Sequence, residues 1–349
     1  MERRKEIKLV IWDLDNTLWK GILSENTVNG LNDNIHEIVE ELDARGILQS
    51  ICSKNDYETA ASELKKWGLH DYFLYPQINW NAKSDNIREI LTRINLSADA
   101  TAFIDDQAFE RDEVSYHLPD VLCLDALEIQ GLLDRPEMNP RFITEDSRQR
   151  RKMYQSDILR NQQEESYQGT KDEFLETLNM RLTISMAREN DLMRASELTV
   201  RTHQLNSTGY TYSFEELRSF LSDDRYILQV VELTDRYGSY GKIGLILVEQ
   251  DQSMMRLKLL LTSCRVMSRG IGSALLGTLI NRALDTGREL QAEFVPTNRN
   301  RIMALTYSLM GFRIIEERDG VQLMRYEKNE RWSPAHHLHI QEEVKIKDV

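Results

Sequence analysis

The sequence predicts an α/β protein of two domains, a doubly wound parallel sheet followed by a mixed α/β domain. At 349 residues the chain is too long for one ordinary α/β unit. Over roughly the first 130 residues, strand-like and helix-like segments alternate, which is typical of a parallel sheet covered on both faces. Farther along, short strand-like segments follow one another closely, which indicates an antiparallel meander.

In the first domain, apolar runs predict the strands and amphipathic segments predict the helices. Gly46 and Gly68 each follow an amphipathic segment, and glycine is the residue that commonly ends a helix. Right-handed crossovers between successive strands then give the doubly wound arrangement. The strands are expected at 7–12, 47–52, 73–78, 101–105 and 121–125, and the helices at about 33–45, 56–67, 84–94 and 107–116.

The second domain is expected to begin with a strand near Leu182 and a helix. Ser213 and Glu216 are spaced as in a capping box, which marks a helix start. The other elements are expected as helices at about 191–201, 269–284 and 299–309, and strands at 226–233, 243–250, 256–266, 290–296 and 311–315. The predicted boundaries are a first domain at 1–140, a charged helical connector at 141–179, a second domain at 180–327 and a C-terminal tail at 328–349.

The composition limits the partners that the chain can have. A formal net charge of −13 and a pI near 5.2 argue against nucleic acid or an anionic membrane, because both reward concentrated Lys and Arg. Only three cysteines are present, far apart, and no stretch resembles a signal peptide or an 18-residue apolar span. These features predict a soluble cytoplasmic protein. Cys123 and Cys264 lie in strand-like segments and are expected to be core residues.

Two carboxylates follow the first expected strand. Asp13 and Asp15 stand two places apart, and alternate strand residues share a face, so both are expected to project toward one point. Two close carboxylates suit Mg²⁺, which takes one or two protein carboxylates and shares its remaining shell with water and substrate phosphate. This pair therefore predicts phosphoryl-transfer chemistry.

The ends of the other expected strands carry residues that suit the same chemistry. Ligands of such sheets bind outside the carboxyl ends of the strands. A further carboxylate can complete a metal shell, while a hydroxyl and an ammonium group can hold a transferring phosphoryl group. The strand-end set is Asp13, Asp15, Cys52, Ser53, Lys54, Asn55, Lys83, Asp105 and Asp106.

These residues resemble the four motifs of haloacid-dehalogenase-like (HAD) phosphatases: DLDNT, a serine after the second strand, a later lysine and a terminal DD. More narrowly, the chain resembles the FkbH family, in which a HAD domain of subfamily IIIC precedes a GNAT-like domain. The matching stretches are WDLDNTLW at 12–19, CSKN at 52–55, INW at 78–80 with Lys83 shortly after, and DD near ER within 105–111. The resemblance implies a glyceryl transferase/phosphatase. Such an enzyme removes phosphate from 1,3-bisphosphoglycerate and loads the glyceryl group onto an acyl carrier protein in polyketide or other natural-product biosynthesis.

The resemblance also implies a role for each residue. Asp13 would be the nucleophile that forms a phosphoaspartate, and Asp15 would be the general acid and then base, contacting Mg²⁺ through its carbonyl. Asp106 would be the second carboxylate ligand of the metal, with Asp105 beside it. The phosphate-binding residues would be Thr17, Ser53, Lys54 and Lys83. The alternative for Lys83 is a solvated lysine at a helix start.

Cys52 distinguishes a transferase from a simple phosphatase. A thiolate can attack an acyl phosphate and hold the acyl group as a thioester before its transfer to a phosphopantetheine thiol. A thiol at the end of an apolar strand is more often inert. The CSKN match favours catalysis.

The second domain resembles the GNAT acyltransferase fold. Its strand, glycine turn and helix can place backbone N–H groups on a pyrophosphate of CoA or phosphopantetheine. Met267 stands where the GNAT signature has Gln or Arg, so one expected polar residue is absent although the backbone cradle can survive. The glycine pair also fits tight packing alone. Tyr307 would protonate a leaving thiolate or else be a core tyrosine. The expected CoA- or pantetheine-binding residues are Arg269, Gly270, Gly272, Asn300 and Tyr307.

Two other interpretations of the whole chain stay open. One is an Mg²⁺ phosphatase fused to an independent GNAT N-acyltransferase, with Cys52 inert. The other is a GNAT-like domain that only recruits the carrier protein.

Several polar features outside the two expected sites have more than one interpretation. The basic run of the connector is expected to be a solvated helix face or a docking site for an acidic carrier. His203 is expected to be structural or solvated. The tail histidines are expected to chelate metal or to belong to a terminal extension. The basic run comprises Arg148, Arg150, Arg151 and Lys152, and the tail histidines are His336, His337 and His339.

Overall fold

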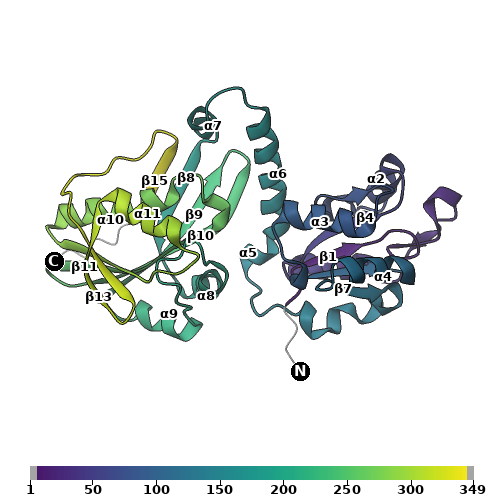
Figure 1. Cartoon of the computed structure of the whole chain (residues 1–349), viewed down its shortest axis with the longest axis horizontal. Helices are drawn as coiled ribbons and strands as arrows, with labels where there is room; N and C mark the ends of the chain where they lie inside the picture. Colours follow the sequence, from purple (N-terminus) through teal and green to yellow (C-terminus); the bar gives the residue numbers. More distant parts are fainter. Residues whose placement is uncertain (1–5, 344–349) are drawn as a thin grey trace. The chain divides into compact units, whose positions relative to one another are not determined.

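The computed structural model describes residues 6–343, and it divides into two compact units. Unit 1 is Met1–Gln155 and unit 2 is Ser156–Val349, drawn in purple to teal and in teal to yellow in Figure 1. The division falls inside the segment 141–179, which the sequence marks as a connector. Residues 344–349, the end of the expected tail, lie outside the described residues, as do residues 1–5.

Unit 1 is built on a five-stranded parallel sheet of order β5-β4-β1-β6-β7. The predicted parallel sheet is therefore confirmed. The third expected strand is shorter than predicted, because Tyr75 takes a positive φ of 49° just before Pro76 and breaks the extended run. The strands are β1 (Leu9–Trp12), β4 (Leu48–Ser53), β5 (Gln77–Ile78), β6 (Thr101–Asp105) and β7 (Leu122–Asp125).

Helices cover both faces of this sheet. Val10 and Trp12 of β1 pack in one apolar cluster with buried residues of α1 and α2. Alternate residues of a strand face opposite sides, so Leu9 and Ile11 face the other layer, where α3 and α4 contact each other and the sheet. This is the doubly wound arrangement that the sequence predicts. The helices are α1 (Ile35–Ala44), α2 (Tyr57–Lys66), α3 (Lys83–Ile94) and α4 (Ala108–His117).

A small hairpin after β1 was not predicted. Its strands, β2 (Trp19–Lys20) and β3 (Gly30–Leu31), pair antiparallel and are too short to show an alternating pattern in the sequence. A turn of 3₁₀ helix, η1 (Leu23–Glu25), lies between them. Another 3₁₀ helix, η4 (Ala126–Asp134), follows β7 and opens with a capping box formed by Asp125 and Glu128.

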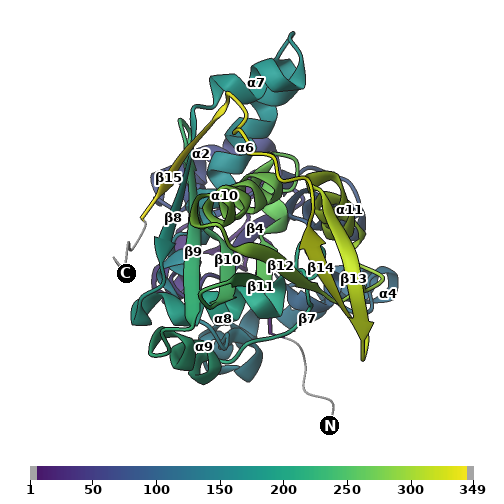
Figure 2. The same cartoon turned by 90° about the vertical axis from the view of Figure 1, so that its left-hand side faces the viewer.

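Unit 2 contains a mixed eight-stranded sheet of order β13-β14-β12-β11-β10-β9-β8-β15, seen in Figure 2. The predicted meander is confirmed, because β9, β10 and β11 pair antiparallel in sequence order. The strands are β8 (Met180–Met186), β9 (Tyr226–Asp235), β10 (Gly238–Gln250), β11 (Met254–Thr262), β12 (Glu289–Phe294), β13 (Phe312–Arg318), β14 (Val321–Tyr326) and β15 (Leu338–Glu342). The helices are α8 (Leu192–Arg201), α9 (Phe214–Leu221), α10 (Ile271–Thr286) and α11 (Arg301–Met310).

Two details of unit 2 correct or confirm the sequence analysis. The strand expected at 256–266 ends at Thr262, because the Ser263 side chain accepts a hydrogen bond from the Arg265 N–H and caps a turn. Cys264 lies in that turn and is exposed, so the prediction of a core residue is wrong, while Cys123 in β7 is partly buried. The predicted capping box is confirmed, with Ser213 and Glu216 bonding each other's backbone at the start of α9.

The expected connector is helical. It contains α5 (Glu145–Arg148), α6 (Arg150–Ser166) and α7 (Lys171–Thr177). Within unit 1, Arg150 donates to the Gly46 carbonyl and Arg151 forms a two-pronged ion pair with Asp43 at 2.9 and 3.0 Å. These two members of the basic run bind their own unit, so the expectation of a solvated helix face is wrong for them.

A buried arginine anchors the second part of α6 inside unit 2. Arg160 is fully buried, and its guanidinium donates to both carboxylate oxygens of Asp235 at 2.7 and 2.8 Å. It also donates to Asp157 at 2.7 Å and to the Gly238 carbonyl at 3.1 Å. The guanidinium carbon lies 3.8 Å from the centre of the Tyr240 ring. Arg160 therefore holds α6 to the β9–β10 turn through charge, hydrogen bonds and ring contact together.

The expected C-terminal tail becomes part of unit 2. Strand β15 pairs in parallel with β8 and forms an edge of the sheet. Before it, the chain runs past α10 (yellow in Figure 2), where Trp332 exchanges two hydrogen bonds of 2.9 Å with the Asn281 side chain. The Trp332 ring lies against Gly277, in the space that a β-carbon would occupy. The glycine in mid-helix thus makes room for the tail.

Gly277→Ala is expected to destabilise unit 2, because the new methyl group overlaps the Trp332 ring. Overpacking of this kind costs about 1–3 kcal/mol, which exceeds the gain of up to about 1 kcal/mol in helix propensity. The measurement is the free energy of unfolding in urea. Gly272→Ala in the same helix is the control, because its methyl group would meet only Thr306 at an ordinary 3.9 Å, and it should stabilise slightly. Equal gains in both variants would contradict the packing of Trp332 on Gly277.

Candidate functional site

Three carboxylates meet at the carboxyl edge of the unit 1 sheet. Asp13 follows β1 directly, Asp105 ends β6, and Asp106 comes next. Because Trp12 of β1 pairs with Ile104 of β6, Asp13 and Asp105 stand at the same level. One ligand atom from each of the three carboxylates can be chosen so that all lie within 4.8 Å of one another. The structure therefore brings together three of the four aspartates that the sequence analysis selected.

Lys83 lies between two of these carboxylates. It is the first residue of α3, and its Nζ donates to Asp13 Oδ1 at 2.7 Å and to Asp105 Oδ2. All three side chains are buried, so a solvated lysine is excluded. Burial raises the pKa of Asp13 to about 7 against the opposing charge of Lys83. Burial alone would lower the pKa of Lys83, but the charges of Asp13 and Asp105 outweigh it and hold that pKa above its ordinary value.

The donor set fits Mg²⁺. All the ligand atoms are carboxylate oxygens, which this hard cation prefers. With all groups ionised, three carboxylates face one ammonium group, which leaves the cluster with excess negative charge. Asp106 Oδ1 is buried without a hydrogen-bond partner, which is costly unless a cation or another donor satisfies it. Burial and the charge of Asp105 both raise the pKa of Asp106, as expected for carboxylates gathered without a counter-ion.

Mg²⁺ is expected to raise the unfolding temperature of unit 1, because a ligand that binds only the folded state stabilises it by mass action. At one hundred times the dissociation constant this stabilisation is about 2.7 kcal/mol. Differential scanning calorimetry in Mg²⁺ and in EDTA measures the shift. Asp106→Asn should lose most of the shift, whereas Asp112→Asn, an exposed acid on α4, should keep it. A full shift in Asp106→Asn would place the metal elsewhere.

Asp15 lies beside this cluster and is held by three donors. Its Oδ1 accepts from the Trp19 indole N–H at 2.7 Å and from the Leu23 N–H at 3.1 Å. Its Oδ2 accepts from the Asn55 amide at 3.1 Å. Neither the bonding role of Trp19 nor that of Asn55 was predicted, and Asn55 was noted only as a strand-end residue. The only sequence signal for Trp19 is its fixed distance from Asp15 in WDLDNTLW.

Of the expected phosphate-binding residues, Thr17, Ser53 and Lys83 lie at the carboxylate cluster, whereas Lys54 pairs with another residue. Thr17 and Ser53 are buried at the site: Thr17 Oγ1 accepts from the Asp106 N–H at 3.1 Å, and Ser53 Oγ accepts from Asn55 at 3.2 Å. Lys54 instead forms an ion pair with Glu110 at 2.6 Å. In this arrangement the Lys54 charge is neutralised at the rim of the site, and Lys83 is the ammonium group at its centre.

Cys52 lies next to the cluster but is closed off from solvent. Its side chain is fully buried, and Sγ lies 3.7 Å from the Lys83 carbonyl oxygen. Burial raises the pKa of the Cys52 thiol well above its usual range; the Lys83 charge opposes this rise, and the neighbouring carboxylates add to it. In this conformation the thiol is therefore protonated and out of reach of a substrate. A ligand could reach Sγ only if the start of α3 moved away.

Alkylation is expected to distinguish the cysteines. Iodoacetamide should modify exposed Cys264 well before Cys52, because only the thiolate reacts and Cys52 is both buried and protonated. Peptide mass spectrometry over time gives the order, and Cys52 should become reactive on addition of denaturant. Rapid modification of Cys52 in the native protein would show that the start of α3 opens readily.

At the glycine turn of unit 2, Arg269, one of the expected CoA- or pantetheine-binding residues, is buried. Gly270 caps α10 with a φ of 73°, a conformation that favours glycine, and Gly272 lies in the first turn. Arg269 is buried, and its guanidinium carbon lies 5.5 Å from the centre of the Tyr240 ring, while its Nε has no hydrogen-bond partner. The first N–H groups of a helix have no partner within the helix, but the Arg269 side chain beside them is buried in the unit.

The Asn300 side chain is hydrogen-bonded within unit 2, and the Tyr307 side chain is buried there. The Asn300 amide donates to the Asn206 carbonyl at 3.1 Å and to the Val295 carbonyl at 2.9 Å. Tyr307 is fully buried, and burial raises the pKa of its hydroxyl, with the nearby Ser207 side chain opposing that rise.

A short segment of the chain lies between β11 and β12. The two strands pair only between Met254–Leu257 and Glu289–Ala292. Beyond that point, the Ser207 N–H donates to the Leu260 carbonyl, and the Val295 N–H donates to the Ser207 carbonyl, both at 2.9 Å. Segment 205–207 therefore bridges the two strands where they diverge.

The histidines take no part in either site as the structure describes it. His203 is exposed in the loop after α8. Among residues 6–343, the group formed by Asp13, Asp105 and Asp106 is the one cluster of three or more metal-ligating side chains, so the tail histidines do not form such a site there. None of the helices in these residues has the length and apolar character needed to cross a bilayer.

Comparisons with known proteins show similarity to two kinds of enzyme. No family model matches the chain, and no curated protein matches it. Among solved structures, it is similar to the N-terminal part of a Bacteroides fragilis protein that contains a phosphatase domain and is complexed with Mg, at 30% identity and a TM-score of 0.35. That match covers 39% of this chain and 40% of the Bacteroides chain, so the chain spans less than half of that structure.

The other similar structures are acetyltransferases. A spermidine N-acetyltransferase from Vibrio cholerae, in complex with CoA and spermine, matches at 16% identity over 42% of this chain and 97% of its own, with a TM-score of 0.33. A GNAT-family acetyltransferase from Streptococcus pneumoniae matches at 24% identity over 41% and 97%, with a TM-score of 0.31. The chain is thus similar in part to a phosphatase domain and in part to GNAT acetyltransferases.

Proposed function

We propose that unit 1 is an Mg²⁺-dependent phosphatase in which Asp13 attacks phosphorus. The observation that carries this proposal is the cluster of Asp13, Asp105 and Asp106 within 4.8 Å, with the Lys83 ammonium group bound to two of its members. Bound Mg²⁺ would be held by these carboxylates and would neutralise phosphate charge. Nothing else in the described part of unit 1 combines a buried nucleophile, an ammonium group and metal ligands in one place.

In the proposed reaction, Asp13 is the nucleophile and Asp15 transfers the protons. An Asp13 oxygen forms a bond to phosphorus while the bond from phosphorus to the leaving oxygen breaks, and Asp15 gives that oxygen a proton. A water molecule then attacks the phosphoaspartate, Asp15 takes its proton, and inorganic phosphate leaves with Asp13 restored. Lys83, together with the Thr17 and Ser53 hydroxyls, stabilises the charge on the transferring phosphoryl group. Trp19 and Asn55 hold Asp15 in the position from which it moves the proton.

Release of inorganic phosphate from acetyl phosphate tests this proposal. The full chain is expected to release phosphate in Mg²⁺ and to stop when EDTA is added in excess. Absence of any Mg²⁺-dependent release from acetyl phosphate or 1,3-bisphosphoglycerate would overturn the proposal.

A second candidate function is transfer of the acyl group, as the FkbH resemblance implies. Supporting it is the position of Cys52, whose Sγ lies 3.7 Å from the backbone of the residue that would hold the phosphate, Lys83. After movement of α3, the Cys52 thiolate would attack the carbonyl carbon of 1,3-bisphosphoglycerate and expel the 1-phosphate, which leaves a 3-phosphoglyceryl thioester. Hydrolysis of the remaining 3-phosphate ester at Asp13 would then give the glyceryl thioester and a second inorganic phosphate. The glyceryl thioester would then exchange onto the pantetheine thiol of an acyl carrier protein.

Intact mass spectrometry separates the two candidates. The protein is incubated with 1,3-bisphosphoglycerate, Mg²⁺ and a holo acyl carrier protein, and both proteins are weighed. Cys52→Ala should abolish the glyceryl adducts while retaining some phosphate release. If the unaltered chain forms no glyceryl adduct on itself or on the carrier protein, acyl transfer is contradicted and only the phosphatase function remains.

For unit 2 we propose that the pantetheine arm of a carrier protein or CoA enters between β11 and β12. The gap after Leu257 and Ala292 supports this, because an extended ligand can add to a diverging strand edge there. Segment 205–207 would have to leave the gap first. Acetyl transfer from CoA to an amine would instead favour an independent N-acyltransferase. Undiminished loading of the carrier by a chain that lacks residues 180–349 would count against recruitment by unit 2.

A further inference from the structure

We propose that Glu113 of α4 is a positioning residue of the unit 1 site. Its carboxylate holds the start of α3, and this keeps Lys83 in the carboxylate cluster and Cys52 covered. The catalytic consequence of this inference rests on the functions proposed above, whereas the contact itself belongs to the fold of unit 1.

The Glu113 side chain accepts two hydrogen bonds from one residue of α3. Its Oε2 accepts from the Ser84 N–H at 3.1 Å, and its Oε1 accepts from the Ser84 hydroxyl at 2.5 Å. Ser84 is buried, and the Glu113 side chain is only 20% exposed. Hydrogen bonds to an ionised carboxylate are short and strong, and water competes little for these two.

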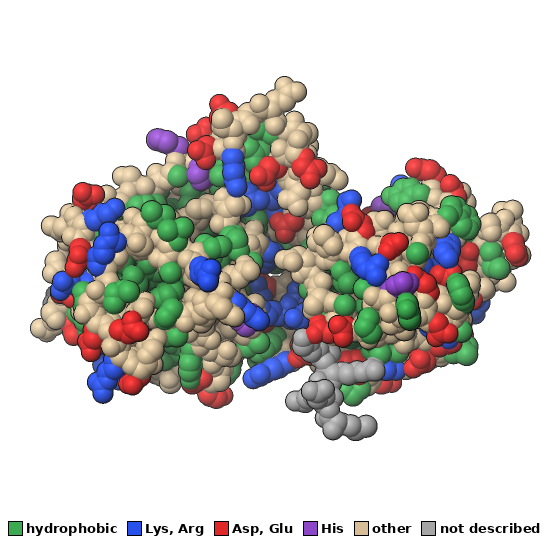
Figure 3. All heavy atoms as spheres, viewed as in Figure 1, with side chains coloured by type: hydrophobic (Ala, Val, Ile, Leu, Met, Phe, Trp, Pro, Cys, Tyr) green, Lys and Arg blue, Asp and Glu red, His purple; other side chains and the backbone are tan. Residues whose placement is uncertain are grey.

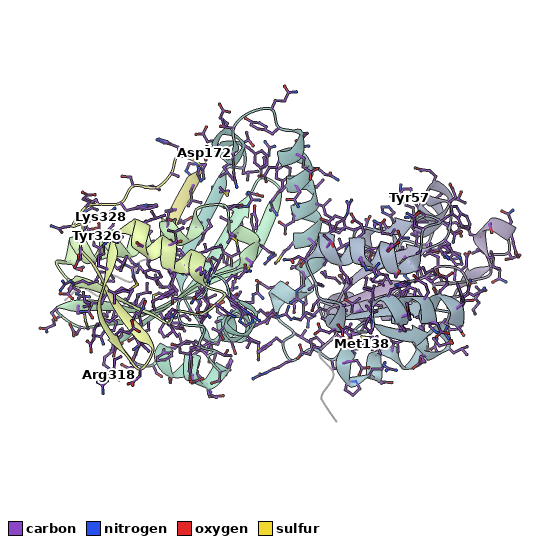
Figure 4. All side chains as sticks on the ribbon, in the orientation of Figure 1. Tyr57, Met138, Asp172, Arg318, Tyr326 and Lys328 are labelled. Atoms are coloured by element: carbon purple, nitrogen blue, oxygen red, sulfur yellow. The ribbon has the colours of Figure 1, made fainter. Side chains whose placement is uncertain are left out.

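This contact supplies a cap that α3 lacks. The first N–H groups of a helix have no partner within it, and a side chain commonly accepts from one of them. In α2, which begins at Tyr57 (labelled in Figure 4), that acceptor is Asp56, which binds the Thr59 N–H at 3.0 Å. The corresponding residue of α3 is Ala82, whose side chain has no acceptor. Glu113 therefore caps α3 from a neighbouring helix, and its negative charge suits the positive end of the helix.

The capped segment carries two groups that the proposed reactions depend on. Lys83, the residue before Ser84, donates to Asp13 at 2.7 Å through its ammonium group. The carbonyl oxygen of Lys83 lies 3.7 Å from Cys52 Sγ. Because Lys83 and Ser84 are adjacent, movement of the Ser84 N–H away from Glu113 displaces the ammonium group and the carbonyl together.

The rest of α3 has its own supports, so loss of the cap should act locally. The Asn79 and Asn86 side chains exchange hydrogen bonds of 3.2 and 3.0 Å. Farther along the helix, Ile87 and Ile90 are completely buried. These contacts should keep α3 folded and packed when its first residues come away from Glu113.

An acid on the surface of a helix is ordinary, and the partner of Glu113 is what distinguishes it. Asp and Glu side chains are scattered over the face of unit 1 seen in Figure 3. The alternative partner of Glu113 is His117, one turn along α4, whose Nε2 lies 3.9 Å from Oε1. That distance is longer than both contacts with Ser84, and His117 is exposed. The geometry therefore favours the role at α3 over an ion pair within α4.

The two proposed reactions need opposite states of this segment. Phosphoryl transfer at Asp13 needs Lys83 in place, whereas attack by Cys52 needs the Lys83 carbonyl to move off the sulfur. A contact that favours the closed state supports phosphate release and restrains the thiol. Loss of that contact should shift the population toward the open state.

Alkylation of the full chain and three variants tests the inference without relying on either activity. Peptide mass spectrometry gives the rate at which iodoacetamide modifies each cysteine of the native protein. Glu113→Ala should raise the Cys52 rate about tenfold, because loss of a helix cap shifts an equilibrium by about this factor. Glu113→Gln keeps an acceptor for the Ser84 N–H and should raise the rate by about threefold or less. Asp112→Ala, which removes the exposed acid next to Glu113, should leave the rate within about twofold.

The other two cysteines separate local opening from general loosening. Cys123 lies in β7 of the same unit, and Cys264 lies in a turn of unit 2. Opening confined to the start of α3 should leave both of their rates unchanged in Glu113→Ala. An equal rise at Cys52 and Cys123 would show that unit 1 loosens as a whole and would overturn the inference. An unchanged Cys52 rate would overturn it as well.

Phosphate release gives a second readout. In Glu113→Ala, kcat/KM for acetyl phosphate in Mg²⁺ should fall by about fivefold or more, because Lys83 spends less time in the cluster, and Glu113→Gln should recover most of this loss. Normal release by Glu113→Ala would overturn the role in positioning Lys83. If the unaltered chain releases no phosphate, the phosphatase function fails, and the alkylation rates still decide whether Glu113 holds the start of α3.

Discussion

Asp13→Asn is expected to reduce phosphate release from acetyl phosphate by at least about 10⁴-fold, the scale on which removal of a catalytic nucleophile acts. An amide cannot form the bond to phosphorus, and it also removes one carboxylate from the proposed metal site. The substitution deletes a buried negative charge, but Lys83 keeps its hydrogen bond to Asp105, so the fold should persist. Rates of phosphate release at saturating Mg²⁺ measure the effect.

Trapping the intermediate gives an independent check on Asp13. Rapid acid quench and mass spectrometry should find one phosphoryl group on the unaltered chain, located on the peptide that contains Asp13. Asp112→Asn should behave like the unaltered chain, because Asp112 is an exposed acid outside the cluster. A phosphoryl group that persists in Asp13→Asn would identify a different nucleophile.

Arg160→Ala is expected to lower the free energy of unfolding of unit 2 by about 3–5 kcal/mol. Removing one member of a buried ion pair leaves the other charge buried without compensation. Here the uncompensated group is Asp235, which keeps only the Tyr240 hydroxyl at 2.9 Å and nearby backbone N–H groups as donors. Urea unfolding followed by circular dichroism measures the change.

Two further variants test the explanation for Arg160. Arg236→Ala removes an exposed arginine next to Asp235 and should change stability by no more than about 0.5 kcal/mol. Replacing both Arg160 and Asp235 with apolar residues should recover part of the loss, because the fully buried carboxylate is then removed and the carboxylate left unpaired, Asp157, is partly exposed to solvent. A small effect of Arg160→Ala would show that water reaches Asp235 and solvates it.

Much of unit 1 was predictable because its strands are buried and their ends carry the chemistry. The apolar runs predict the sheet, and a parallel sheet places all carboxyl ends at one edge. This is why Lys83 meets Asp13 and Asp105 although it is far from both in the sequence. The roles of these residues stay predictions until the variants are measured.

The details that escaped prediction depend on side-chain geometry between distant residues. Nothing in the sequence indicates that Lys54 pairs with Glu110, which is 56 positions away. Trp19 reaches back to Asp15 only because a hairpin of two-residue strands turns the chain there. The burial of Cys52 depends on how the start of α3 sits over the end of β4. The periodicity of apolar residues predicts which face of a helix or strand is buried. The contacts of Lys54, Trp19 and Cys52 lie at the ends of elements, where this periodicity carries no information.

The prediction for the C-terminal tail was limited for another reason. Residues after about 327 are polar and lack a long apolar pattern, so they were assigned to a terminal extension. Strand β15 has only Leu338 buried, which is too weak a signal to predict a strand. Its partner, β8, supplies the hydrogen bonds that make it one.

The pairing of β15 with β8 bears on the order of folding during synthesis. The strand that opens the sheet of unit 2 receives its outer neighbour from residues 338–342, which leave the ribosome after all the other strands of that sheet. Until then, β8 presents a row of unpaired N–H and C=O groups, the kind of exposed edge that recruits other chains. The newly made protein is therefore vulnerable to aggregation until its last described strand arrives. A chain shortened at residue 327 would keep that vulnerability permanently.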